Sequence, residues 1–153
     1  MNKTKTILVN ISRFILAVVF IFSGYVKAID PLGTQYKIQD YLSALGMGEF
    51  IPEVLILCLS VALSAFEFSL GIMMLFAIQR RVISKLTVAF LAIMTIVTLW
   101  ISIANPISDC GCFGDAIILT NVQTFCKNVV LLLLAIIVAI WPLRMKRLIS
   151  HTN

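Results

Sequence analysis

The sequence predicts an all-α integral membrane protein: a single bundle of four transmembrane helices with both termini in the cytoplasm. Three observations predict this class. Of the 153 residues, 61% are hydrophobic and only 12% are charged; the mean hydropathy is +1.06; and four stretches are long and apolar enough to cross a bilayer core. A soluble domain carries about 25% charged residues, roughly twice this fraction. The composition therefore excludes an ordinary soluble domain, a disordered chain and a disulfide-knotted secreted module.

The four expected spans contain most of the apolar sequence. Backbone polar groups in lipid must be satisfied within a segment, and barrel strands would alternate in polarity, so each stretch is predicted to be a helix. We expect the spans at residues 7–29, 53–78, 82–104 and 125–143, with outer loops at 30–52 and 105–124, all in one domain covering 1–153.

The first span has some features of a cleaved signal peptide, because Lys3 and Lys5 precede an apolar run. However, the run is long, contains Arg13, and ends at residues 25–29 without a small-x-small cleavage site. We interpret it as a retained helix.

The distribution of basic residues predicts the orientation. Nine of them would lie at one membrane face: Lys3, Lys5, Arg13, Arg80, Arg81, Lys85, Arg144, Lys146 and Arg147. Only Lys27, Lys37 and Lys127 would lie at the other face, so we expect the nine to be cytoplasmic, with the protein in a bacterial inner membrane. Six of the seven acids fall on the outer side. The net charge of +5 therefore follows from topology and does not indicate nucleic-acid binding.

The first outer loop contains an amphipathic pattern. Ile38, Tyr41, Leu42 and Leu45 recur at helical spacing, and Gly46 follows them. We expect a short helix on the outer membrane surface that ends at Gly46.

Four cysteines, all expected in the outer half, point to redox chemistry: Cys58, Cys110, Cys112 and Cys126. A bond between Cys110 and Cys112 would close a very small ring, so it would add little chain-entropy stabilisation. Strained or exposed disulfides are also the easily reduced ones. We therefore predict that Cys110 and Cys112 form a redox-active pair in a loop facing the periplasm or the outside.

Two other interpretations of this loop stay open: a structural disulfide to Cys126 or Cys58, and a metal site. Asp109 and Asp115 flank the pair, but the only histidine is His151 in the tail, and the usual two-residue spacing of thiolate ligands is absent. We expect no metal at this loop.

The remaining cysteines have separate expectations. Cys126 heads the fourth span beside Lys127, and a helix N-terminus and a cation both favour a thiolate, so Cys126 is a candidate second thiol. Cys58 alone is expected to be a small buried apolar residue.

Several motifs resemble the MauE/DoxX-type family of small four-helix membrane proteins. The Asp-Cys-Gly-Cys-Phe-Gly-Asp segment at 109–115 is similar to the family signature, as are Arg13, residues 23–27, residues 30–33 and the intramembrane Glu67. The resemblance implies a redox-associated membrane protein. MauE members are linked to maturation of methylamine dehydrogenase, whose small subunit is rich in disulfides, and DoxX relatives include a subunit of a thiosulfate:quinone oxidoreductase.

Glu67 is the one acid expected within a span, near mid-membrane. A carboxylate there costs roughly 2.5–3.5 kcal/mol on insertion scales, so it needs a partner or a proton. Arg13 is a candidate partner, and an ion pair between Arg13 and Glu67 would fix the register of the first span against the second. The functional alternative is a proton relay beside a quinone. Lys27, with Asp30 and Asp40, surrounds the outer mouth, where snorkelling and a binding role explain it equally well.

The predicted function is thiol–disulfide exchange with an extracytoplasmic partner, either thioredoxin-like or rich in disulfides. Exchange would proceed through a mixed disulfide with Cys110 or Cys112, which the other cysteine resolves. Electrons would then pass to a quinone, the one cofactor considered, and Glu67 would relay protons. Two alternatives remain: a non-enzymatic assembly or docking subunit for a redox enzyme, and a small transporter subunit.

Overall fold

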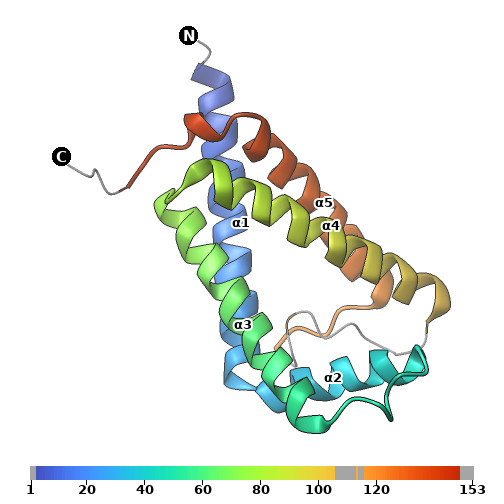
Figure 1. The fold of residues 1–153 in the computed structure, drawn as a ribbon. Helices are drawn as coiled ribbons and strands as arrows, with labels where there is room; N and C mark the ends of the chain where they lie inside the picture. Colours follow the sequence, from blue (N-terminus) through green and yellow to red (C-terminus); the bar gives the residue numbers. More distant parts are fainter. Residues whose placement is uncertain (1–2, 106–112, 114–115, 149–153) are drawn as a thin grey trace.

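The computed structural model describes residues 3–105, 113 and 116–148, and the described chain is helical (Figure 1). Its elements are α1 (Lys3–Ile29), α2 (Pro31–Ala44), α3 (Glu53–Phe76), α4 (Arg80–Ala104), α5 (Asn121–Ile140) and a short 3-10 helix (Pro142–Arg144). Of these, α1, α3, α4 and α5 are long and apolar enough to cross a membrane. The predicted all-α bundle with four spans is confirmed.

The ends of the helices differ from the expected spans where local chemistry sets them. α5 begins four residues early because Thr120 and Gln123 form a capping box, in which each side chain bonds the other residue's backbone N–H. It ends at Ile140 because Pro142 has no N–H to donate and instead opens the 3-10 helix.

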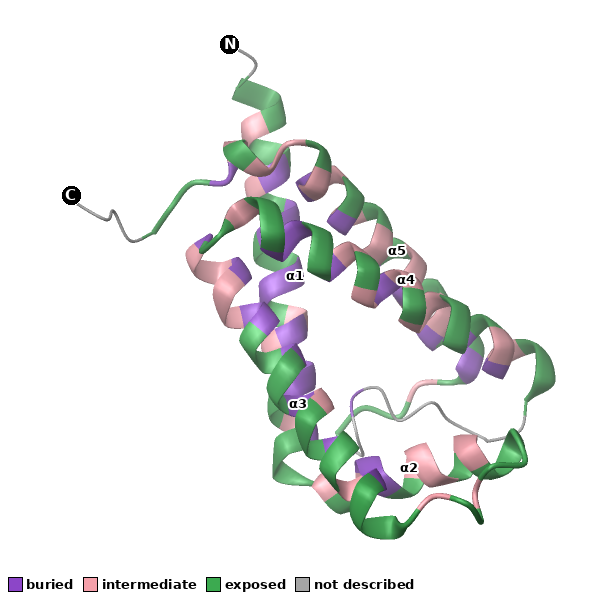
Figure 2. Ribbon diagram, viewed as in Figure 1, coloured by how far each residue is buried: buried purple, intermediate pink, exposed green. Residues whose placement is uncertain are grey.

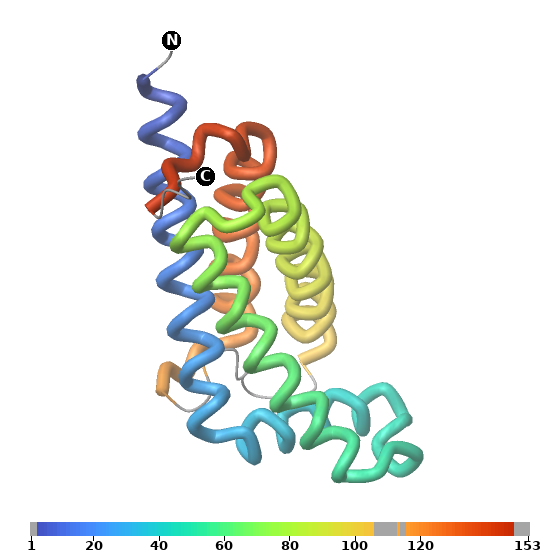
Figure 3. The backbone as a smooth tube through the Cα atoms, turned by 60° about the vertical axis from the view of Figure 1, so that its left-hand side comes forward, coloured from blue at the N-terminus to red at the C-terminus, as the bar shows by residue number. Residues whose placement is uncertain are grey.

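The four spans form two closely packed pairs, α1 with α3 and α4 with α5 (Figure 3). In the first pair the backbones touch. A methyl group built on Gly24 would lie 2.5 Å from the backbone N of Phe68, and one built on Gly71 would lie 2.7 Å from the backbone N of Ile21. Small residues at such contacts let helices approach closely in lipid. Gly24 and Gly71 thus fix the register of α1 against α3.

α2 is the helix expected in the first outer loop, but it begins at Pro31, before the apolar pattern that predicted it, and its buried residues are Thr34 and Gln35. The Asp30 carboxylate caps it by accepting from the Gly33 N–H at 2.9 Å, and it ends just before Gly46, whose φ is +75°. α2 runs across the end of the bundle opposite the chain termini (Figure 1). The Ser60 hydroxyl donates to the Pro31 carbonyl at 2.8 Å, so the first two turns of α3 extend past the end of α1.

The outward faces of the spans are largely apolar and exposed (Figure 2), as expected for contact with lipid. The main buried cluster lies between the four spans and reaches the chain termini, where Val9, Val138 and Met145 are almost fully buried.

Three side chains hold the segment after α5 at this end. Asn10 donates to the Arg144 carbonyl, Arg13 donates to the Lys146 carbonyl at 2.7 Å, and Arg80 donates to the Leu143 and Met145 carbonyls at 2.9 Å each. Both ends of the described chain therefore meet at the same end of the bundle.

Candidate functional site

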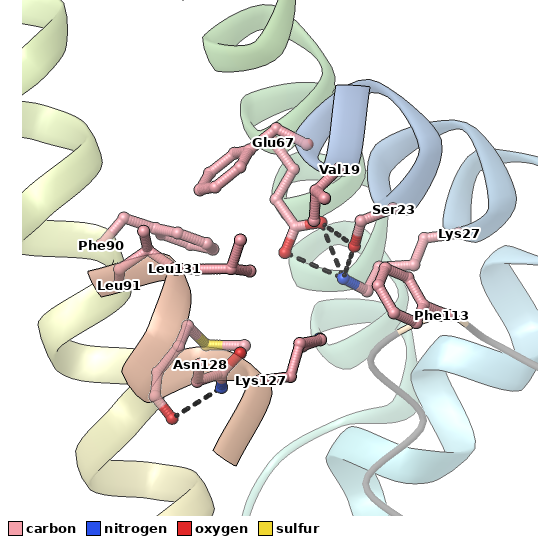
Figure 4. A pocket seen from close by; sticks show the side chains of 12 residues that line it. Val19, Ser23, Lys27, Glu67, Phe90, Leu91, Phe113, Lys127, Asn128 and Leu131 are labelled. Atoms are coloured by element: carbon pink, nitrogen blue, oxygen red, sulfur yellow. Dashed lines mark hydrogen bonds and ion pairs between the residues drawn. The ribbon is translucent and has the colours of Figure 1, made fainter. Parts of the chain in front are cut away.

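A buried ion pair joins α1 to α3. The Lys27 Nζ lies 2.7 Å from Glu67 Oε2 and 2.8 Å from Oε1, and both side chains are about 4% exposed. Ser23, one turn before Lys27 on α1, donates to Glu67 Oε2 at 2.7 Å and accepts from Lys27 Nζ at 2.9 Å. The three groups form a closed triangle in which each N–H of Lys27 has an acceptor (Figure 4).

This pairing differs from the partner considered from the sequence. Glu67 does not pair with Arg13, which instead binds the Lys146 carbonyl at the other end of the bundle. Arg13 lies 14 residues before Lys27, about 21 Å along the same helix. Lys27 does not snorkel outward either, since it is buried and turned toward Glu67.

The depth of Glu67 explains the difference. Counting from Glu53 puts Glu67 near mid-membrane, but α3 starts beyond the end of α1. Ser60 is level with Pro31, and Glu67 is only seven residues, about 10 Å, further along α3. Glu67 therefore meets the last turns of α1, where Lys27 lies, and not its beginning.

A small cavity with a mainly apolar lining and a few polar groups adjoins the triangle, between the two helix pairs. Its volume is about 30 Å³, and its polar lining consists of Ser23, Lys27, Glu67, Lys127 and Asn128 (Figure 4). A site needs roughly 10–15 Å³ and several polar partners to hold a water molecule. The cavity therefore suits one or two waters, and in this conformation it is far smaller than the roughly 300 Å³ or more of a typical small-molecule pocket.

Phe113 closes one side of this cavity. Phe113 is 8% exposed. The centroid of its ring lies 5.6 Å from that of Phe22, and the Lys127 Nζ lies over the Phe113 ring, 4.1 Å from its centroid. The residue thus touches both α1 and α5 beside the Lys27–Glu67 pair (Figure 4). Aromatic pairs and cation–π contacts of this kind are each worth about 1 kcal/mol, so Phe113 is held against α1 and α5.

The four cysteines that were considered from the sequence fall into two groups. Cys110 and Cys112 lie outside the described residues. Cys58 and Cys126 carry free thiols and are exposed on the outer surfaces of α3 and α5. The expectation that Cys58 is buried was wrong, because it lies on the part of α3 that extends beyond α1.

No group of three or more His, Cys, Asp or Glu side chains that could hold a metal ion occurs in the part of the chain that the structure describes. Asp30, expected at the outer mouth, acts as the cap of α2. Asp40 is exposed on α2.

Sequence reasoning identified Glu67 but missed the rest of the cluster around it. Ser23 and Lys27 are four residues apart, so they share a face of α1, and the adjacent Gly24 marks that face as a close contact. These signals could have indicated Lys27 as the partner. Nothing in the sequence indicated that Phe113 is buried against Lys127.

The comparisons with known proteins agree with this architecture. Searches of curated proteins and of solved structures find no significant match. The model of the family described as "Methylamine utilisation protein MauE" matches residues 5–142, which include nearly all of α1, the whole of α3, α4 and α5, and the ion pair. The chain belongs to the MauE family and is a multi-pass membrane protein linked to methylamine utilisation.

Proposed function

We propose that this protein exchanges thiol and disulfide equivalents with an extracytoplasmic partner through Cys110 and Cys112, at the α2 end of the bundle. The observation that supports this proposal is the position of Phe113. It follows Cys112 directly in the sequence, and its buried ring lines a small cavity that a buried carboxylate, Glu67, also lines. The distribution of charge supports an outward orientation of this end, since nine of the twelve basic residues belong to the opposite end.

The exchange balances as two electrons and two protons. One partner thiolate attacks a sulfur of the Cys110–Cys112 disulfide and forms a mixed disulfide, and the other cysteine leaves as a thiolate. The partner's second thiolate then attacks the partner's own sulfur in the mixed disulfide, and the bound cysteine of this chain leaves as a thiolate. The partner becomes a disulfide, and Cys110 and Cys112 become a dithiol. In the reverse direction Cys110 or Cys112 attacks a partner disulfide, and the other cysteine resolves the intermediate.

Glu67 and the cavity would serve proton transfer in this scheme. Thiol oxidation releases protons and thiolate departure consumes them, so a cavity that has room for water and is lined by a carboxylate would provide a local donor and acceptor. Lys27 and Ser23 hold both oxygens of that carboxylate in fixed positions.

A quinone is the electron acceptor that we propose for reoxidation of the dithiol, since reduction to the quinol takes up two electrons and two protons. The 30 Å³ cavity holds water rather than a quinone ring. Quinone would therefore react at the lipid-facing surface, or after the two helix pairs separate.

Mass-shift alkylation of the full chain in intact cells tests the proposal. In the wild type, Cys110 and Cys112 should resist a maleimide–polyethylene glycol reagent until reductant is added. Cys110→Ser or Cys112→Ser should abolish the partner's recovery in oxidised form. Cys58→Ser is the matched control and should leave the recovery of oxidised partner unchanged. Permanently free thiols at 110 and 112, or full rescue of a deletion strain by both variants, would contradict the redox role.

A second candidate is a non-enzymatic assembly subunit for a redox enzyme. Its support is the apolar surface at the α2 end, where Tyr36, Met47 and Phe50 are 61%, 44% and 84% exposed. Such a surface marks contact with a protein or with the membrane. A stable partner that co-purifies after both loop cysteines are replaced by serine would favour this candidate over the redox role.

A further inference from the structure

The two helix pairs contribute different hydrogen-bonding groups to the small cavity beside Glu67. On the side of α1 and α3, Lys27 Nζ donates to Ser23 Oγ and to both oxygens of Glu67, so its three N–H groups are already used. On the side of α5, Asn128 lines the cavity and is 3% exposed. What the cavity can hold therefore depends on the Glu67 oxygens and on the direction of the Asn128 amide.

Two acceptors on α4 orient the amide of Asn128. Its Nδ2 donates to the Thr98 hydroxyl at 3.3 Å and to the Met94 carbonyl at 3.5 Å. The Thr98 hydroxyl gives its own proton to the Met94 and Thr95 carbonyls, at 2.8 and 3.1 Å, so toward Asn128 it can only accept. If the amide were turned over, its oxygen would face acceptors alone. Nδ2 therefore points to α4, and Oδ1 is directed away from α4 and toward the cavity (Figure 4).

Glu67 keeps one position at which it can accept a further hydrogen bond. Its Oε2 accepts from Ser23 and from Lys27 at 2.7 Å each, whereas Oε1 accepts from Lys27 at 2.8 Å, its one partner among the described residues. A carboxylate oxygen has about two lone-pair sites, so Oε1 can accept once more. Glu67 Oε1 and Asn128 Oδ1 are thus two acceptors at the same cavity, one from each helix pair.

Two acceptor oxygens favour an occupant that donates two hydrogen bonds. A small anion would bring its own lone pairs against both oxygens, and a metal cation would lie beside the Lys27 ammonium. A water molecule has two O–H groups, and the volume of about 30 Å³ is sufficient for it. Because a buried polar atom without a partner is costly, a water that satisfies both oxygens also stabilises the contact between the two helix pairs.

We infer that a water molecule in this cavity donates to Glu67 Oε1 and to Asn128 Oδ1, and that Asn128 positions this water for proton transfer. The inference rests on the proposed role of Glu67 as a proton acceptor and donor. In each transfer to Glu67, the water gives one proton to Oε1 and takes up one proton that thiol oxidation releases, so it is regenerated. Asn128 neither gains nor loses a proton, because it only accepts a hydrogen bond from the water.

A crystal structure of the full chain that resolves ordered waters tests the position. In the wild type, one water oxygen should lie about 2.5–3.0 Å from both Glu67 Oε1 and Asn128 Oδ1. Asn128→Leu, which is similar in size but has no acceptor, should have no water in contact with Glu67. A wild-type cavity without a water on both oxygens would overturn the inference, and this result does not depend on whether Asn128→Leu folds.

Solvent isotope effects test whether Asn128 acts on proton transfer. The rate at which glutathione disulfide oxidises the reduced full chain is measured in H2O and in D2O. Asn128→Leu should lower this rate roughly 10- to 100-fold, because a misplacement of about 1 Å can cost that much. It should also raise the isotope effect, since proton transfer then limits the rate more strongly. Asn128→Gln keeps an amide and should recover part of the rate.

Asn10→Leu is the matched control. It is the same substitution at the opposite end of the bundle, where Asn10 donates to the Arg144 carbonyl, and it should leave the isotope effect unchanged. A lower rate in Asn128→Leu with an unchanged isotope effect would overturn the positioning role, because a purely structural defect behaves in this way.

Failure of this inference is distinguishable from failure of the proposed function. If Cys110→Ser and Cys112→Ser lose the exchange but the wild-type cavity has no water on both oxygens, only the inference about Asn128 fails. If both serine variants keep the exchange, the redox role fails, and the proton transfer that Asn128 would serve fails with it, even where the water is present.

Discussion

Replacing Lys27 by methionine tests the energetic role of the buried ion pair. Both side chains are about 4% exposed, and Lys27 Nζ makes three hydrogen bonds of 2.7–2.9 Å, two to Glu67 and one to Ser23. Removing one partner of a buried pair leaves the other charge without compensation, which costs about 3–5 kcal/mol. We expect Lys27→Met and Glu67→Gln each to lower the free energy of unfolding by an amount in this range.

The double variant separates the pair from its two charges. Lys27→Met with Glu67→Gln leaves no buried charge, and the amide can still accept from Ser23. Replacing both members of a buried pair is often neutral or stabilising, so the double variant should lose at most about 1–2 kcal/mol, the cost of imperfectly replaced hydrogen bonds. It should therefore be more stable than either single variant.

Unfolding of the full chain by sodium dodecyl sulfate in mixed micelles, followed by circular dichroism, measures these differences. Lys3→Met is the matched control, since it is the same substitution on the same helix at an exposed position, and it should change stability by no more than about 0.5 kcal/mol. Two results would refute the argument that Lys27 and Glu67 compensate each other's buried charge. One is a double variant whose free energy of unfolding falls by the sum of the two single losses, and the other is a loss below about 1 kcal/mol for Lys27→Met.

Three further variants test other contacts. Gly24→Ala should destabilise the bundle although alanine favours helices by about 1 kcal/mol, because its methyl group would lie 2.5 Å from the Phe68 backbone N; thermal denaturation in detergent measures this. After reduction, Phe113→Ala should raise the alkylation rate of the Cys110 and Cys112 thiols several-fold, because it removes two contacts worth about 1 kcal/mol each. Arg80→Gln should speed trypsin cleavage after Arg144, because two hydrogen bonds to that segment are lost.

Each of these variants has a control. Ala65→Val adds bulk to an exposed position of α3 and should leave the melting temperature almost unchanged. Phe14→Ala removes a ring that is 56% exposed and should not alter thiol reactivity. Arg81→Gln, next to Arg80, should not accelerate cleavage, since neither of those two carbonyl bonds involves it. A control that behaves like its test variant would remove the support for that contact.

The segment with Cys110 and Cys112 is the part of the proposed function that sequence reasoning carries furthest. The Cys-Gly-Cys spacing is a local feature, so it can be interpreted without knowing how the helices pack. The partner of Glu67 could not be found in this way. Predicting it required the offset between α1 and α3, which depends on Ser60 meeting Pro31 and on two backbone contacts at glycine.

By itself the sequence determined that the chain has four helices able to span a membrane, that a helix follows the first span, and that one carboxylate is buried. These properties follow from apolar length, periodicity and the cost of charge in lipid, all of which are local. Only the tertiary structure decided that this carboxylate binds Lys27 rather than Arg13, and that Phe113 lies beside it. The reason is physical: an ion pair across two helices depends on their relative depth, and close packing at Gly24 and Gly71 sets that depth.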